Sequence, residues 1–391
     1  MTIKKTLLIG TAMASLAASS AHAAVINLID RGGVTGSQAD LGFRIAANYW
    51  ASIISNDITI NLGVRFAPLA PNVIGSTGST QQDFSVAEYE RRLGATRSNS
   101  ALDTALVLPA LTTGGVSGLT TGVDDTGNND TRVTATLDGS QTASRVLFAN
   151  SSVIKAVGGT VANPNGLDGN VTFSSTFGFD FNPTNGISNN TFDFIGVAIH
   201  EIGHALGFVS GVDFFDVFGA PNGPNRGALG YDLNNTSVFS ALDLFRYSAP
   251  GQLDFRVGGS PYFSIDGGQT ALFGAFLSTG TFNGDGNQAS HFRDNNGPDG
   301  CERQLGILDP TFCFGQTGVV TRLDLAAFDA IGYNLRVDAL TYQDTSTASI
   351  YRSFFTAVPE PSTWGMMIFG FGLIGATMRR KTRTTVRFAI V

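Results

Sequence analysis

The sequence predicts an α+β fold in which an N-terminal mixed sheet with helices precedes a loop-rich C-terminal subdomain. Up to residue 207, stretches with strand-like alternation are interspersed with stretches whose apolar residues recur at the helical period of about 3.6 residues. Beyond that point, short apolar segments stand between turns rich in Gly, Phe and Asp. The 391 residues suffice for one large or two ordinary domains with a sizeable core.

The N-terminal part alternates between expected strands and expected helices. Strand patterns occur at Val25–Ile29, Ile58–Phe66, Arg132–Leu137, Ala143–Ala149 and Asn170–Phe181, and helical patterns at Ser37–Asn56, Phe84–Leu93 and Ser100–Leu106. Loops are expected at Pro68–Thr80 and Gly114–Asp130. In the second loop Asp124, Asp125 and Asp130 could bind Ca²⁺, but they lack the spacing of an EF-hand, and a solvated acidic loop is the better interpretation.

One expected helix, within Thr191–Gly207 (TFDFIGVAIHEIGHALG), carries residues that indicate chemistry. Asn190 is a plausible N-cap, and Gly207 a plausible C-terminal stop. His200 and His204 are four residues apart and therefore stand on one face of the helix, where both imidazoles can bind one Zn²⁺. The two histidines enclose a glutamate, and this HExxH pattern is typical of the helix of a zinc protease.

Glu201 lies one residue round from the first histidine, close enough to take a proton from water without being a ligand itself. The alternative is a half-buried helix that carries two histidines by accident. Burying His, Glu and His without partners would be unfavourable, and this argues for the metal site.

A catalytic zinc usually has three protein ligands, so two histidines leave the site incomplete. In the extended motif HExxHxxGxxH, the third histidine stands where this chain has Ser210, a poor zinc ligand. Removal of a signal peptide containing His22 leaves His291 as the remaining histidine of the mature chain. His291 is therefore the expected third ligand.

The segment HEIGHALGF, followed by a long insertion and a distant histidine, resembles the leishmanolysin-like arrangement within the metzincin zinc proteases. The resemblance implies a zincin fold with a Met-containing turn beneath the metal, here Gly306–Pro310 with Leu308 in place of Met. It also implies a closing helix at Leu323–Tyr333. Tyr333 could be a metal-facing phenol, as in some metzincins, although a core tyrosine is the more ordinary interpretation.

The inserted segment supplies further candidates. Ser240–Ser248 is expected to form a helix or strand, and Tyr262–Ile265 and Ala271–Leu277 are short apolar segments. Asp213 and Asp216 could hydrogen-bond a ligand imidazole, although turn carboxylates are the plainer alternative. Cys301 and Cys313 are the two cysteines, and in an exported chain they indicate a disulfide, because a thiolate ligand pair usually has closer spacing.

The N-terminus has the pattern of a secretory signal peptide. Lys4 and Lys5 form a basic region, Thr6–Leu16 an apolar one, and Ala21–Ala23 an A-x-A cleavage site. Cleavage by signal peptidase is expected after Ala23. A membrane anchor is the alternative, but the apolar run is too short to span a bilayer.

The C-terminus carries a second signal. A Pro-Glu-Pro motif at Pro359–Pro361 precedes an apolar run at Trp364–Met378 and a basic cluster at Arg379–Lys381. This order resembles the PEP-CTERM sorting signal of Gram-negative bacteria, which implies transient inner-membrane anchoring, processing by an exosortase, and release to the cell surface or surroundings. A lasting C-terminal transmembrane helix is the alternative, and its basic flank fits the positive-inside rule.

Composition narrows the possible partners. Lys and Arg number 24 against 31 Asp and Glu, giving a net charge of −7, which argues against nucleic acid and anionic membrane surfaces as partners. The expected organisation is a signal peptide at 1–23, a catalytic domain at 24–337 divided into 24–207 and 208–337, a polar linker at 338–357, and a sorting segment at 358–383.

These features together predict an exported zinc endopeptidase that hydrolyses proteins or peptides. His200, His204 and His291 would hold Zn²⁺, Glu201 would be the general base, and an edge strand would hold the substrate extended. A gluzincin-like protease with Glu302 as third ligand is one alternative. A surface or biofilm matrix protein with a vestigial metal site is another, which the Gly-, Asn- and Thr-rich composition also fits.

Overall fold

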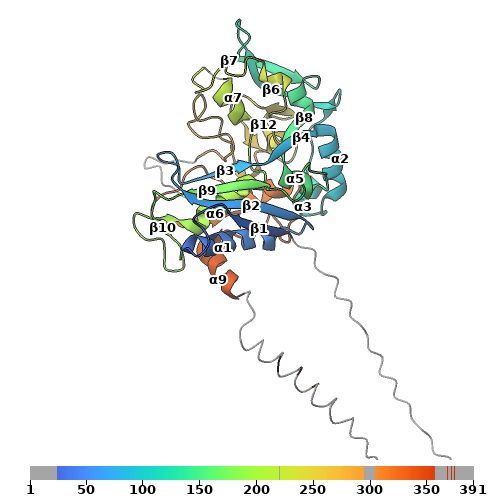
Figure 1. Cartoon of the computed structure of the whole chain (residues 1–391). Coiled ribbons are helices and arrows are strands. Elements are labelled where there is room, and N and C mark those ends of the chain that lie inside the picture. The colour runs from blue at the N-terminus through green and yellow to red at the C-terminus, as the bar shows by residue number, and fades with distance from the viewer. Residues whose placement is uncertain are drawn as a thin grey trace, which may run out of the picture.

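The computed structural model describes residues 24–219, 221–294 and 304–356, together with Ile368, Phe371 and Ile374. It confirms a mixed α+β architecture, with nine α-helices and several sheets in this part of the chain. Figure 1 shows a four-stranded sheet in the lower half of the body, with α1 beneath it and the strands β6, β7 and β12 above it. The expected signal peptide at 1–23 lies outside the described residues.

The lower sheet has three parallel strands and one antiparallel edge strand. Its order is β1 (Val25–Asp30), β2 (Thr59–Ala67), β9 (Gly169–Ser174) and β3 (Gly75–Ser79). The first three strands were expected. The loop predicted at Pro68–Thr80 is wrong in its second half, because β3 pairs with β9 along its whole length. Its sequence, GSTGS, lacks the apolar alternation that marks a strand.

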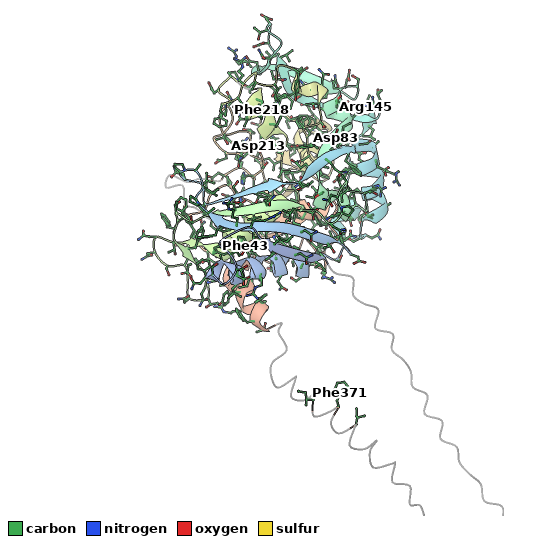
Figure 2. All side chains as sticks on the ribbon, in the orientation of Figure 1. Phe43, Asp83, Arg145, Asp213, Phe218 and Phe371 are labelled. Carbon is green, nitrogen blue, oxygen red and sulfur yellow. The ribbon has the colours of Figure 1, made fainter. Side chains whose placement is uncertain are left out.

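Two helices pack against this sheet and against each other, α1 (Gln38–Ile53) and α6 (Phe194–Ala205). Phe43, labelled in Figure 2, meets the ring of Phe194 edge-on at 5.1 Å between centroids. The indole N–H of Trp50 donates to the backbone oxygen of Ile199 at 3.0 Å. The close approach of α1 and α6 requires glycine at position 42, because a Cβ there would stand 2.3 Å from the Phe194 ring. These contacts fix α6 against the core.

The upper half contains a six-stranded sheet. Its order is β14 (Tyr262–Phe263), β12 (Arg246–Ala249), β13 (Gln252–Asp254), β6 (Gly115–Val123) and β5 (Leu111–Thr112), and β7 (Asn129–Asp138) pairs with β6. The surface loop predicted at Gly114–Asp130 is therefore wrong. The glycines of this stretch disfavour a strand, whereas its threonines favour one. Pairing with β7 supplies hydrogen-bond partners for the backbone, and this decides for the strand.

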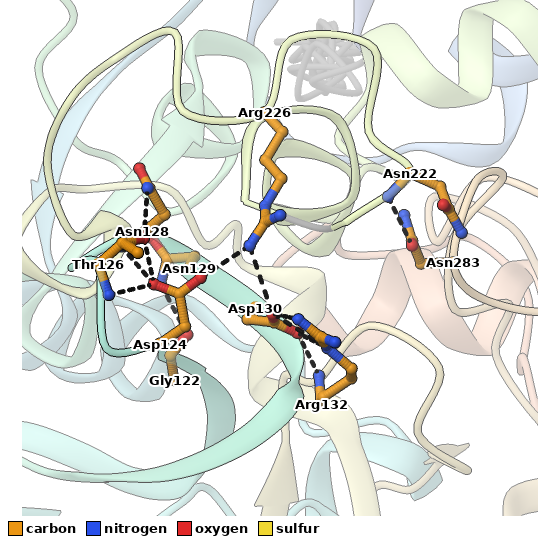
Figure 3. Close-up of polar contacts among 10 residues, drawn as sticks. All are labelled: Gly122, Asp124, Thr126, Asn128, Asn129, Asp130, Arg132, Asn222, Arg226 and Asn283. Carbon is orange, nitrogen blue, oxygen red and sulfur yellow. Dashed lines mark hydrogen bonds and ion pairs between the residues drawn. The ribbon is translucent and has the colours of Figure 1, made fainter.

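The acidic residues of this region pair with arginines. Arg226 contacts Asp124 at 2.8 Å and Asp130 at 3.3 Å, and Arg132 contacts Asp130 at 2.5 Å (Figure 3). Asp124 also accepts the N–H of Thr126 within its own turn. These carboxylates therefore already have cationic or donor partners, and calcium binding here gains no support.

Further short strands and helices complete the described part of the chain. They are β4 (Gln81–Ser85), α2 (Val86–Thr96), α3 (Ala101–Ala105), α4 (Thr142–Arg145), β8 (Val146–Asn150), α5 (Ser151–Ala156), β10 (Phe179–Asp180), β11 (Phe192–Asp193), α7 (Val212–Phe218), η1 (Leu233–Asn235), η2 (Leu242–Phe245), η3 (Leu272–Gly274), β15 (Val319–Val320), α8 (Arg322–Ala330), β16 (Thr345–Ser346) and α9 (Thr347–Thr356). Phe84 thus lies in a strand, and the stretches predicted at Ala143–Ala149 and Ser240–Ser248 each combine a short helix with a strand.

The segment predicted as a polar linker, 338–357, belongs to the folded body over its described residues, 338–356. Its strand β16 pairs with β15, and its helix α9 packs against α1. The Thr347 hydroxyl donates to Asp193 at 2.5 Å. Within the described residues no helix is both long and apolar enough to cross a membrane. The apolar run Trp364–Met378 lies largely outside them.

Asp193 joins α6 to α9, and its removal is predicted to destabilise the fold. One carboxylate oxygen caps Gly196 N–H, and the other accepts Gly318 N–H and the Thr347 hydroxyl, all in a buried environment. Asp193→Ala loses the cap and leaves buried donors unpaired, so we expect unfolding free energy to fall by about 3 kcal/mol. Urea denaturation measures this. Asp40→Ala, an exposed pair with Arg44, is the control and should change stability by less than about 0.5 kcal/mol. Equal effects of the two substitutions would contradict the assignment.

Candidate metal centre

The helix α6 presents the predicted His-Glu-His pattern from a fully buried position. Its N-cap is Asp193 rather than the predicted Asn190, because the Asp193 carboxylate accepts the N–H of Gly196. The helix ends as predicted at Gly207, whose φ of +114° lies in the region that favours glycine, and where a Cβ would stand 2.3 Å from Val153. Every residue of α6 is buried, so its orientation is set by packing.

Three histidines converge beside this helix, as the sequence predicted. The Nε2 atom of His204 lies 3.0 Å from Nε2 of His200 and 3.2 Å from Nε2 of His291, and the third side of the triangle is 3.2 Å. The side chains are 7–8% exposed. Among the described residues, they form the one group of His, Cys, Asp and Glu with the geometry to hold a metal ion.

Backbone carbonyls determine which ring nitrogens carry the protons. Nδ1 of His200 lies 2.7 Å from the oxygen of Ile307, and Nδ1 of His204 lies 2.7 Å from the oxygen of Phe208. Nδ1 of His291 lies 3.2 Å from the oxygen of Gln288. A carbonyl oxygen only accepts, so each Nδ1 must donate, and each neutral ring then has an unprotonated Nε2.

The three Nε2 lone pairs therefore point at one another with no proton between them. Such an arrangement is unfavourable without a cation and suits a metal ion, which binds neutral imidazole nitrogens. Burial lowers the pKa of His200 to about 3 and that of His204 to about 4, and it places the pKa of His291 well below its usual value. All three rings are thus neutral at pH 7, the form that ligates.

Glu201 lies beside the histidines under the edge strand β3. The Thr77 hydroxyl lies 2.7 Å from the Glu201 carboxylate and 2.9 Å from its backbone oxygen. Burial raises the pKa of Glu201 to about 7, although the Thr77 hydrogen bond acts in the opposite direction. The backbone passes so close that a Cβ on Gly75 would stand 2.5 Å from Glu201 Oε1. The strand thus fixes the position of this carboxylate.

A turn lies below the site at Gly306–Pro310, where the sequence predicted it. Its residue Ile307 contacts His200 through the backbone oxygen. Leu308 is fully buried, and its side chain packs against α6 at Gly203. Asp324, in the first turn of α8, accepts the N–H groups of Ile307 and Leu308 at 2.9 and 3.1 Å. Asp324 therefore orients the carbonyl of Ile307 that contacts His200.

Tyr333 does not face the site. It is fully buried and packs against the ring of Phe328, with 6.0 Å between centroids, and it does not line the cleft above the histidines. The possibility of a metal-facing phenol at this position is therefore not realised. The competing interpretation, a core tyrosine, is the one that the structure supports.

A buried charge network holds the segment that carries His291. Asp213 accepts the N–H of Ala289 at 2.6 Å and the N–H and hydroxyl of Ser290 at 3.1 and 2.5 Å. Arg246 donates to the oxygens of Ala289 and Ser278 at 3.1 and 2.9 Å. Asp213 lies in the upper half of the body, as Figure 2 shows. It therefore orders the backbone next to a ligand.

Asp213 and Asp216 accept hydrogen bonds from backbone N–H groups rather than from an imidazole, so the plainer alternative, turn carboxylates, is the one that the structure supports. Asp216 accepts the N–H groups of Phe282 and Asn283 at 2.8 and 2.9 Å. The segment has little regular structure, so its backbone N–H groups cannot all pair within a helix or sheet. These carboxylates accept hydrogen bonds from them instead. Backbone carbonyls orient the ligand rings instead.

The histidines open into a cleft of about 570 Å³. Its walls come from β3, from the segment before His291 and from the turn after Leu308, and they include Thr77, Glu201, Asn287, Pro310 and Phe312. The volume lies within the range of about 300–1,000 Å³ that ligand sites occupy. An extended chain can therefore reach the three nitrogens from solvent.

Residues 357–381 match the PEP-CTERM protein-sorting motif. The match agrees with the segment predicted from the sequence, and it marks the chain for export to the cell surface of a Gram-negative bacterium through processing by an exosortase-type enzyme. No curated protein and no solved structure matches the chain.

Some predicted site residues lie outside the described part of the chain. Cys301 and Glu302 belong to this group, so the disulfide with Cys313 and the glutamate alternative for the third ligand stay predictions. Sequence reasoning missed Thr77, which lies in an expected loop, and Arg246, which no motif marks. Asp324 had a signal, since Thr321 three residues earlier completes a capping box.

Measuring the metal content of variants distinguishes between His291 and Glu302 as the third metal ligand. We expect about one metal ion per chain in the purified protein, retained in Glu201→Gln and largely lost in His291→Ala, because a site with two ligands binds far more weakly. Elemental analysis after dialysis against a weak chelator gives the stoichiometry. Glu302→Ala is the control and should keep its metal. Retention by His291→Ala together with loss from Glu302→Ala would show that the third ligand is the glutamate.

Proposed function

We propose that this chain is an exported zinc-dependent endopeptidase. The observation that carries the proposal is the triangle of three unprotonated Nε2 atoms, with the carboxylate of Glu201 held beside it in an open cleft. A structural metal site needs no neighbouring carboxylate with a raised pKa, whereas a hydrolase needs a general base. The sorting motif marks the chain for export, and this supports an enzyme that acts outside the cytoplasm.

Zinc is the metal that fits the nitrogen triangle best. Three nitrogens bound at about 2.0–2.1 Å in tetrahedral geometry are separated from one another by roughly 3.3 Å. The distances here are 3.0–3.2 Å. Imidazole also binds copper, iron and nickel, but three neutral nitrogens with one position open to a cleft are typical of catalytic zinc.

The proposed reaction is hydrolysis of a peptide bond. A bound zinc ion would polarise the scissile carbonyl and lower the pKa of water to about 7. Glu201 takes a proton from the attacking water, which lets oxygen bond to the carbonyl carbon. As the C–N bond breaks, Glu201 delivers this proton to the leaving amine. The Thr77 hydroxyl holds the carboxylate in place throughout.

The edge strand β3 is suited to hold an extended substrate. The hydrogen bonds Ser174 N to Ile74 O and Thr80 N to Asp168 O direct the even-numbered backbone groups toward β9. Since these groups alternate in an antiparallel strand, those of Gly75, Thr77 and Ser79 point to the opposite edge. Gly75 and Thr77 line the cleft, so a peptide paired with this edge lies across the metal site.

A surface matrix protein with a vestigial metal site is the competing function, and the sorting motif is equally compatible with it. Such a protein would need the histidines but not Glu201. The hydrogen bond from Thr77 and the close approach of Gly75 are specific to the position of that carboxylate, and both favour the enzyme.

Replacing the proposed general base tests the enzyme directly. Glu201→Gln keeps the shape of the side chain but cannot accept the proton, so we expect caseinolysis to fall by about 10²–10⁴-fold while the metal is retained. Cleavage of labelled casein and metal analysis of the same sample give both quantities. Glu88→Gln, an exposed residue paired with Arg91, should be fully active. Equal activity of both variants would exclude Glu201 as the base.

Two glycines of β3 form a matched pair for a second test. A methyl group at Gly75 would meet Glu201 Oε1 at 2.5 Å, whereas nothing lies within 4 Å of a Cβ at Gly78. Gly75→Ala must displace the carboxylate, so we expect at least a tenfold loss of kcat/KM with metal content unchanged. Gly78→Ala should be close to wild type. If Gly75→Ala were fully active, the exact position of Glu201 would not matter for the reaction.

A further inference from the structure

A second hollow of about 560 Å³ lies next to the metal cleft, and no part of the proposed mechanism uses it. Three large aromatic side chains form its walls, although each is well exposed: Phe148 by 38%, Phe214 by 37% and Tyr231 by 50%. Phe148 comes from β8, Phe214 from α7, and Tyr231 from the segment between α7 and η1. Exposed apolar side chains gathered around a concave surface are typical of a binding site.

The hollow is continuous with the metal cleft. Val209 and Ser290 line both cavities. Ser290 precedes the ligand His291, and Val209 follows Phe208, whose carbonyl oxygen contacts His204. A chain that crosses the metal site can therefore continue into the hollow without leaving the protein surface.

The unpaired edge of β3 and β4 also runs from the metal cleft to the hollow. Thr80 links β3 to β4, and its N–H and its carbonyl are both bonded on one side, to Asp168 and Ser151. The backbone of Gln81 therefore faces the same open edge as that of Thr77. Gln81 lines the hollow, whereas Thr77 lines the metal cleft. One uninterrupted strand edge thus runs from Glu201 to the aromatic walls.

We propose that this hollow, named here the aromatic pocket and defined by Phe148, Phe214, Tyr231 and Val238, binds a large apolar side chain of the same peptide that occupies the metal cleft. The proposal rests on the proposed function. Thr77 and Gln81 are four residues apart, which is about 13 Å of extended strand at about 3.3 Å per residue. The bound side chain lies about four residues from the scissile bond.

The direction of the peptide decides on which side of the bond this residue stands. Antiparallel pairing is the more stable arrangement, and β3 itself pairs antiparallel with β9. A peptide antiparallel to β3 and β4 runs from the aromatic pocket toward the metal. The recognised side chain is therefore on the amino-terminal side. The substrates are extended segments with Phe, Tyr, Trp or Leu about four residues before the cleaved bond.

Binding to an inactive protein tests the pocket without turnover. The probes are fluorescent nine-residue peptides of small polar residues in which a single Phe is moved from position to position, and the protein is zinc-loaded full-length Glu201→Gln. We expect one position to bind about tenfold more tightly than the others, as burial of one apolar side chain produces. In the Glu201→Gln background, Tyr231→Ala and Phe214→Ala should abolish this preference. Phe276→Ala, an equally exposed aromatic residue outside both cavities, should retain it.

The outcomes separate this proposal from the proposed function. Equal affinity for all positions, or a preference that survives Tyr231→Ala and Phe214→Ala, would overturn the aromatic pocket. Ser237→Trp, which fills the hollow from a half-buried position on its wall, gives an independent check and should remove the preference as well. The active protein is then given the same peptides. Cleavage without a preference for Phe overturns the pocket alone, whereas positional binding without any cleavage supports the pocket and overturns the endopeptidase.

Discussion

The geometry of the site depends on which nitrogen of each histidine ring carries the proton. Backbone oxygens of Ile307, Phe208 and Gln288 hold the Nδ1 protons of the three histidines, and this leaves three lone pairs directed at one point. The three oxygens come from separate parts of the chain: the turn before α8, the residue after the α6 stop, and the inserted segment. Forming the site therefore requires most of the fold, although only α6 carries a recognisable motif.

Around the three histidines, buried carboxylates order segments of the chain that form no helix or strand. Asp216, Asp243 and Asp324 are buried in the loop-rich half, and each accepts two or more backbone N–H groups. Hydrogen bonds that a charged carboxylate accepts are stronger than those between neutral groups, so a few aspartates can order long segments that form no sheet. This accounts for an acidic composition in a protein in which Glu201 is the one acidic residue among the described residues that line the cleft above the histidines. The excess of negative charge is largely internal.

Sequence reasoning succeeded where a local pattern carries the information. The strands β1, β2 and β9, the helix around His200 and the position of His291 beside that helix all follow from periodicity, residue chemistry or the shortage of other histidines. It failed where tertiary pairing overrides a weak local preference. The GSTGS strand β3 and the Thr- and Gly-rich strand β6 are stabilised by their neighbours in the sheets, and the roles of Thr77, Asp213 and Arg246 depend on contacts between segments far apart in the chain.

The helix α9 ends at Thr356, and the sorting motif begins at residue 357. The two therefore adjoin without a spacer, and α9 is anchored to the core through α1 and through the Asp193–Thr347 hydrogen bond. An exosortase-type enzyme that processes the motif therefore acts on a segment attached directly to the folded body. If the proposed function holds, processing would leave every residue of the cleft in place and change only where the cleft acts, so one event at the C-terminus would determine which proteins the cleft meets.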